Sequence, residues 1–283
     1  MILLVGAGLV LADVLVYLVL RIWRHGPRSS ARGAAQWAHV VVLGCGTQIA
    51  LAAVLRGTVV VVRALLAGRR AGRWVAERAT APGARLRAVL PAVRAGVEVV
   101  QLDVCGPVAV THRLFSPRVA ISTGLVERTT EEELRAVVQH ELHHARRRHP
   151  LGRLAVDAVA GALWFVPALR TVAVHVKTRQ ELAADQAALR VVTPGVVASA
   201  LVKSLAPDGP EAGGARLVRA GTAMGGETAL EARVRQLEGG PRGFGRRLRC
   251  CSLRRSLVLV VVLAGVWVYC GVTAAAGLCE GSF

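Results

Sequence analysis

Residues 139–150, "QHELHHARRRHP", contain four of the eight histidines of the chain. Within them His140, Glu141 and His144 form the pattern H-E-x-x-H. On a helix, residues i and i+4 face the same way, so His140 and His144 can hold one zinc ion between them. Glu141 then points toward the open position of the metal, where it can accept a proton from water and pass it to a leaving amine. Zinc would lower the pKa of that water and polarise the carbonyl under attack. The spacing therefore predicts a hydrolytic zinc site.

The other histidines of this stretch are not expected to bind the metal. His143 lies three residues after His140 and could replace His144, but only the His140/His144 pair leaves Glu141 as the base. His149 follows a run of three arginines and is expected to take no part in the site. The competing interpretation of the whole stretch is a solvated polar end of a helix.

A catalytic zinc needs a third protein ligand, and the segment "RQELAADQAAL" at 179–189 supplies candidates. Glu181 and Asp185 are i and i+4 on a second predicted helix. We expect Glu181 to bind zinc and Asp185 to accept a hydrogen bond from the far nitrogen of a ligand histidine, which fixes its tautomer. The alternatives are a merely solvated helix face, or His175 as the third ligand.

Simple secondary-structure signals surround these residues. The alternating segment "RVAIS" at 118–122 predicts a strand. Residues 129–149 predict a helix, with Thr130 and Glu133 as its capping box. Pro150 then breaks this helix. A Gly-, Ala- and Pro-rich stretch at 206–227 predicts a flexible loop.

The composition points to a membrane. The chain is 53% hydrophobic, its mean hydropathy is +0.47, and its net charge is +18. Such charge suits either nucleic-acid binding or the basic flanks of membrane spans. The arginines crowd beside apolar runs, and only four Phe and two Tyr are present for stacking on bases. With no recognisable helix-turn-helix, we expect membrane spans and no direct binding of nucleic acid.

Two segments are long and apolar enough to predict terminal spans. Residues 1–20 predict a retained transmembrane helix, and Asp13 within it could pair with Arg56 or Arg63. Residues 256–278 predict the last span, preceded by many arginines. The basic side of the membrane protein is expected to be cytoplasmic.

The apolar stretch at 38–75 is harder to interpret, because Arg56 is followed by Gly57. A turn there would give a hairpin of two helices, at about 38–55 and 58–75. A hairpin also adds an even number of crossings, which keeps the basic loop 21–33 on the side of the later residues. We therefore expect two crossings within 38–75.

The segment "PRVAISTGLVERTTEEELRAVVQHELHHARRRHP" and the later "ELAAD" resemble the BlaR/MecR-type membrane zinc peptidases. They are also similar to the related HtpX and CAAX-prenyl-protease group. The resemblance covers about 106–190 and extends plausibly to the flanking spans. It implies His140, His144 and Glu181 as ligands of one zinc ion per chain, Glu141 as the base, and Asp185 behind a ligand. It also implies that substrate lies extended along the strand 118–122.

The fold implied by this resemblance is an α-helical membrane anchor carrying a mainly helical α+β core of the gluzincin type. The predicted domains are an N-terminal transmembrane region at 1–75, a cytoplasmic zinc metallopeptidase domain at 76–249, and a C-terminal helix and tail at 250–283. Because His140 and Glu181 must meet, the apolar residues 151–169 must return to the same side. They would form either a core helix or a dip into the membrane.

The chain departs from this family pattern in two ways. BlaR/MecR sensors continue past their last span into an extracellular antibiotic-binding domain, whereas this sequence runs to Phe283, so β-lactam sensing is not expected. Gluzincins often stabilise the oxyanion with a His or Tyr beyond the third ligand. Here no His follows His175, and Arg179 or Arg190 are the substitutes considered.

The expected function is a zinc-dependent endopeptidase of the bacterial cell membrane, with several spans and a catalytic domain facing the cytoplasm. The resemblance favours a regulatory protease whose substrate is a cytoplasmic protein such as a transcriptional repressor. The alternatives are a quality-control protease for membrane proteins of the HtpX type, or a non-catalytic membrane signalling protein that keeps the fold. An intact Glu141 argues against the last of these.

Overall fold

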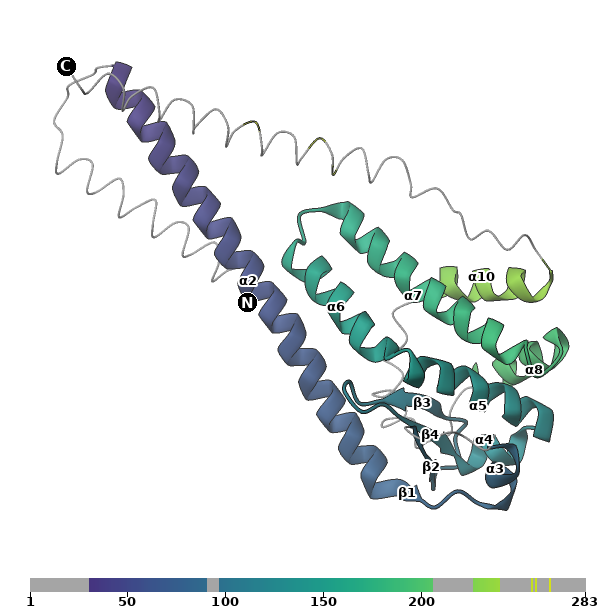
Figure 1. Cartoon of the computed structure of the whole chain (residues 1–283). Coiled ribbons are helices and arrows are strands. Elements are labelled where there is room, and N and C mark those ends of the chain that lie inside the picture. Colours follow the sequence, from purple (N-terminus) through teal and green to yellow (C-terminus); the bar gives the residue numbers. More distant parts are fainter. Residues whose placement is uncertain are drawn as a thin grey trace. The chain divides into compact units, whose positions relative to one another are not determined.

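A computed structural model describes residues 31–90, 97–205 and 226–239, together with Ser256, Val258 and Gly265. The predicted helix 1–20, nearly all of the span 256–278 and most of the loop 206–227 lie outside the described residues. Figure 1 shows the described elements, which are mainly helical with one small sheet. In chain order they are α2 (Ala31–Arg78), β1 (Ala79–Thr80), α3 (Ala84–Val89), β2 (Glu98–Leu102), β3 (Ala109–His112), β4 (Arg118–Ser122), α4 (Thr123–Arg128), α5 (Glu131–Arg146), α6 (His149–Ala162), α7 (Pro167–Ala188), α8 (Pro194–Leu205) and α10 (Gly226–Leu237).

The chain divides into two compact units. One comprises Val59–Ala160 and Leu169–Leu248 and holds the sheet, both hydrophobic clusters and every candidate site residue. The other comprises Met1–Thr58, Gly161–Ala168 and Arg249–Phe283. Within this second unit the guanidinium of Arg56 lies 5.2 Å from the ring centroid of Trp164.

Helix α2 corrects the prediction of an apolar hairpin. It runs without interruption from Ala31 to Arg78, through Arg56 and Gly57, so the turn expected there is wrong. A glycine inside a helix costs only about 1 kcal/mol, and no Pro, Asn or Asp stands beside it to stop the helix. Among the described residues, its segment Gly46–Arg78 is the one that is long and apolar enough to cross a membrane.

The sheet has the strand order β1-β2-β4-β3. The predicted strand 118–122 is confirmed as β4, but it is an inner strand, parallel to β2 and antiparallel to β3. An inner strand has no free edge for a substrate to pair with, so the expectation that substrate lies along 118–122 is wrong. Strand β3, at one end of the order, offers an edge beside α5, which packs against it.

Helix α5 is built as its sequence predicts, over Glu131–Arg146 within the predicted 129–149. Thr130 and Glu133 form the capping box. Its apolar face, including Leu134, Val138 and Leu142, is fully buried in the larger hydrophobic cluster with residues of β4 and α4. This burial fixes the helix against the sheet, and so it fixes the direction in which His140 and His144 point.

Glu133 also connects α5 to α8. Its carboxylate accepts hydrogen bonds from the Thr130 N–H at 2.7 Å, the Ser199 hydroxyl at 2.5 Å and Lys203 Nζ at 2.6 Å. Burial opposes its ionisation, but the hydrogen bonds from Lys203, Ser199 and Thr130 lower the pKa of Glu133 to about 2. A buried carboxylate with three hydrogen-bond donors holds α5 firmly against α8.

We predict that Glu133→Gln lowers the free energy of unfolding at pH 7 by about 2 kcal/mol. Because the folded pKa of Glu133 lies below its ordinary value of 4.5, this contribution is full above pH 4.5 and is lost as the pH falls toward 2. Urea unfolding in detergent at several pH values measures it. Glu132→Gln, an exposed neighbour in the same helical turn, is the control and should change stability by less than about 0.5 kcal/mol. Equal losses in both variants would contradict the prediction.

Helices α6 and α7 form the returning connection that the site requires (Figure 1). Lys177 on α7 is buried and donates to both carboxylate oxygens of Asp157 on α6, at 2.6 and 2.8 Å. Helix α6 contains no buried residue, which argues against a core helix over this part of 151–169. The alternative, a dip into the membrane, stays a prediction.

The first turn of α4 has no room for a side chain at Gly124. A Cβ at this position would lie 1.8 Å from the carbonyl oxygen of Cys105. The Gly124 N–H donates to the carbonyl of Val104 at 2.9 Å, so the two backbones cross in direct contact. The glycine of the "TGL" turn is therefore a packing requirement.

Candidate metal centre

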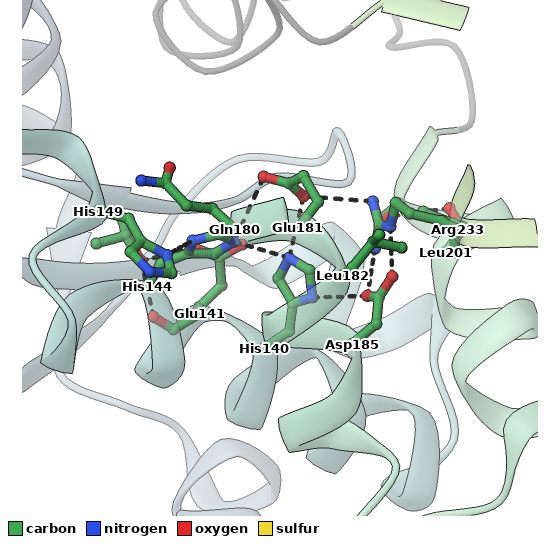
Figure 2. A network of polar contacts seen from close by, with 12 residues as sticks. His140, Glu141, His144, His149, Gln180, Glu181, Leu182, Asp185, Leu201 and Arg233 are labelled. Atoms are coloured by element: carbon green, nitrogen blue, oxygen red, sulfur yellow. Dashed lines mark hydrogen bonds and ion pairs between the residues drawn. The ribbon is translucent and has the colours of Figure 1, made fainter. Parts of the chain in front are cut away.

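His140 and His144 on α5 and Glu181 on α7 converge on one point (Figure 2). The two Nε2 atoms of the histidines lie 3.1 Å apart. Glu181 lies 3.5 Å from both of them, through Oε2 to His140 and Oε1 to His144. Their candidate ligand atoms all lie within 4.8 Å of one another. The structure thus brings together the three residues that the sequence predicted as ligands.

These distances fit a metal ion. Ligand atoms bound tetrahedrally to zinc at about 2.05 Å lie about 3.3 Å from one another. The 3.1 Å between the two Nε2 atoms is close to that edge length, and each Nε2 lies 3.5 Å from a different oxygen of Glu181. Two imidazole nitrogens and one carboxylate are also the donor set of a catalytic zinc that keeps an open position. The residues therefore fit zinc in both spacing and chemistry.

Asp185 lies behind His140, as predicted. Its fully buried carboxylate contacts His140 Nδ1 at 2.9 Å. A proton on Nδ1, donated to Asp185, leaves the lone pair of Nε2 directed at the cluster. Burial opposes a positive charge on His140, yet the hydrogen bonds to Asp185 and Glu181 raise its pKa to about 9.

Two arginines neutralise the carboxylates of the cluster. Arg233 on α10 binds Asp185 with two hydrogen bonds of 2.7 Å and lies 3.6 Å from Glu181. Arg153 on α6 donates to Glu181 from the other side. Burial opposes ionisation of Glu181, but His140, His144 and Arg153 hold its pKa well below the ordinary value. Burial, followed by the charge of His140, lowers the pKa of His144.

The predicted base, Glu141, is held by the edge strand of the sheet. Thr111 on β3 donates a hydrogen bond of 2.7 Å from its hydroxyl to Glu141 Oε2, and the same hydroxyl lies 2.9 Å from the Glu141 carbonyl oxygen. This contact fixes the direction of the carboxylate of Glu141, the residue that directly follows the candidate ligand His140. It also joins α5 directly to β3.

The structure gives His149 a contact with a candidate ligand that the prediction did not include. His149 was expected to take no part, but its Nδ1 lies 2.6 Å from Nδ1 of His144. Burial and the nearby charges of His143 and Arg153 lower the pKa of His149 to about 4. His143 contacts the ring of His149, with centroids 5.4 Å apart. Neither His143 nor His175, the alternative third ligand, belongs to the metal cluster found among the described residues.

Comparison with known proteins supports this arrangement at the level of the family. A family model described as BlaR1 peptidase M56 matches residues 32–235, which include every residue of the cluster. The chain belongs to this M56 peptidase family. The predicted BlaR/MecR-type relationship is therefore confirmed. Membership implies a membrane metallopeptidase, whose substrates are proteins or peptides and whose metal is typically zinc. No curated protein matches the sequence.

Sequence reasoning missed four residues of this M56 centre: Thr111, His149, Arg153 and Arg233. None of them stands at a spacing from H-E-x-x-H that would mark it as part of the site. Arg233 also follows the long Gly- and Ala-rich stretch. The one signal for the two arginines is that a buried carboxylate demands a cation. Arg179 and Arg190, considered as oxyanion donors, are both exposed. In the part of the chain that the structure describes, Arg153 and Arg233 are the arginines that contact the centre.

We predict that Arg233→Met lowers the free energy of unfolding of this M56 peptidase by about 3 kcal/mol. The variant leaves the buried carboxylate of Asp185 without its bidentate partner. Arg235→Met is the matched control, because Arg235 lies on the same helix in an exposed pair with Glu231 and should cost less than about 1 kcal/mol. Thermal unfolding in detergent measures both variants, and similar losses would contradict the assigned role of Arg233.

Proposed function

We propose that this chain is a zinc-dependent endopeptidase of the membrane. The observation that carries the proposal is the convergence of His140, His144 and Glu181, at 3.1 to 3.5 Å, beside a glutamate held by Thr111. A purely structural zinc would close its coordination with protein ligands and would need no base next to it. The intact Glu141 therefore favours catalysis over a non-catalytic protein that keeps the fold.

The residues have separate tasks in this proposal. His140, His144 and Glu181 hold one zinc ion, and Asp185 fixes the tautomer of His140. Zinc, when bound, polarises the scissile carbonyl and makes water a better nucleophile at neutral pH. Glu141 takes the proton of the attacking water and delivers it to the leaving nitrogen. Thr111 keeps the Glu141 carboxylate turned toward that water.

We further propose that the substrate lies extended along β3, since β3 ends the described sheet next to Glu141. Backbone pairing with an edge strand binds peptides independently of their side chains. It requires a stretch of substrate that is locally unfolded. This replaces the strand 118–122, which is enclosed between β2 and β3.

The cytoplasmic orientation of the peptidase domain also belongs to the proposal. A single crossing by α2 puts the basic loop 21–33 on the opposite side from the domain. That loop region has four arginines: Arg21, Arg24, Arg28 and Arg32. More arginines flank the domain in the sequence: Arg69, Arg70, Arg73 and Arg78 at the end of α2, then Arg242, Arg246, Arg247, Arg249, Arg254 and Arg255 before the predicted span 256–278. The larger group favours the cytoplasm, in a multi-pass bacterial membrane protein.

A cytoplasmic domain suits a regulatory protease that cleaves a soluble protein such as a transcriptional repressor. The alternative is a quality-control protease of the HtpX type, acting on membrane proteins. Both use the same chemistry, and they differ in the substrate. Cleavage of a purified repressor at one peptide bond would favour the first, whereas cleavage of many unfolded membrane proteins would favour the second.

The proposal is tested with the full chain purified in detergent. We expect about one zinc ion per chain by mass spectrometry, and cleavage of an unfolded reporter protein. A chelator should stop cleavage, and added zinc should restore it. A protein that binds zinc stoichiometrically, yet cleaves neither the reporter nor itself, would support the non-catalytic alternative instead.

A further inference from the structure

The connection between α5 and α6 is unusually tight. Helix α5 ends at Arg146 and α6 begins at His149. Between them Arg148 has a φ of 50°, a left-handed conformation that is unfavourable for a residue other than glycine. The Arg148 carbonyl accepts hydrogen bonds from the N–H groups of Leu151 and Gly152, which start α6. This turn folds His149 back onto the last turn of α5.

His149 thereby reaches the far side of a candidate ligand. Its Nδ1 lies 2.6 Å from Nδ1 of His144, and the two ring centroids are 4.8 Å apart. His144 is buried and directs Nε2 at the metal cluster. If Nε2 is to offer a lone pair to a metal, the proton of the neutral ring must be on Nδ1. That N–H then points at Nδ1 of His149.

We propose that His149 is the positioning residue of His144: its Nδ1 accepts the Nδ1–H of His144 and so fixes the tautomer and the ring orientation of that ligand. This inference rests on the proposed function, because it assigns a partner to one of the proposed zinc ligands. Asp185 does the same for His140. The two ligand histidines therefore have different partners, a carboxylate on α7 and an imidazole on α6.

The test compares two variants at position 149 with a control on the last turn of α5. His149→Leu removes the acceptor, whereas the Oδ1 atom of His149→Asn takes nearly the position of the imidazole Nδ1 and can accept the same hydrogen bond. We expect the zinc Kd to rise about 10- to 100-fold in the leucine variant and less than about 3-fold in the asparagine variant. Competition with a chromophoric chelator measures both. The visible spectrum of the Co²⁺-loaded protein reports the ligand geometry independently, and should change with leucine alone.

Arg146→Ala is the matched control, because Arg146 lies on the same last turn of α5 but is exposed and outside the cluster. Wild-type zinc affinity in His149→Leu would overturn the inference, as would equal losses in the leucine and asparagine variants or in the control. If the leucine variant fails to fold, His149→Gln replaces it, since its longer amide cannot superpose on Nδ1. His140→Ala separates the two levels: zinc retained there would reject the proposed metal site itself, whatever His149 does.

Discussion

Replacing Glu141 by Gln is expected to slow peptide-bond hydrolysis by about 1,000-fold, while the zinc content of the protein stays unchanged. Gln keeps the size of the side chain and its contact with Thr111, but it cannot take a proton from water. The candidate ligands lie on other residues, so metal binding should not depend on the carboxylate at 141. Initial rates on an unfolded reporter and zinc analysis of the same preparation measure both effects.

The matched control for this variant is Glu132→Gln, which changes an exposed glutamate on the same helix and should leave the rate unchanged. Cleavage at the wild-type rate by a zinc-loaded Glu141→Gln protein would mean that another group is the base. A loss of zinc in this variant would mean that Glu141 belongs to the metal coordination.

The second large effect is expected for Glu181→Gln, which should weaken zinc binding by more than about 100-fold, since loss of a ligand exceeds the loss of a residue behind one. The variant replaces an anionic ligand by a neutral amide. It also removes the negative charge between Arg153 and Arg233, whose guanidinium groups both contact Glu181. The positive charges of Arg153 and Arg233 then face the position of the cation without the carboxylate that lay between them, and they repel the cation.

Zinc affinity in detergent, measured by competition with a chelator, tests this prediction. Glu231→Gln, an exposed carboxylate paired with Arg235 on α10, is the control and should bind zinc like the wild type. His175→Ala tests the alternative third ligand. If zinc is lost with His175→Ala but kept with Glu181→Gln, the assignment of the third ligand is wrong.

The parts of the site that could be predicted from sequence are those held within one helix. His140, Glu141 and His144 share a helix whose capping box was recognisable, and Glu181 and Asp185 share another. Spacing along a helix determines which side chains share a face, so each of these two sets could be predicted without knowing the fold. The meeting of the two helices was inferred from the chemistry of zinc, because two histidines alone do not complete a catalytic site.

What could not be predicted depends on contacts between elements. Thr111 contacts Glu141 because the strand order puts β4 inside the sheet and β3 beside α5. This order could not be read from the sequence. His149 reaches His144 because of one left-handed residue, Arg148. The hairpin at 38–75 failed for a different reason, since a single glycine weakens a helix without ending it.

Two positions of the family motif are constrained for different reasons. Gly124 is constrained by the close contact of two backbones, and Glu141 by the chemistry proposed for it. The "TGL" turn is retained by any descendant that keeps the fold, because even an alanine would collide with the carbonyl of Cys105. Glu141 has no such steric duty and can drift once hydrolysis is no longer under selection. If Glu141 is the base, as proposed, a homologue with this glycine but without the glutamate would keep the fold and lose hydrolysis.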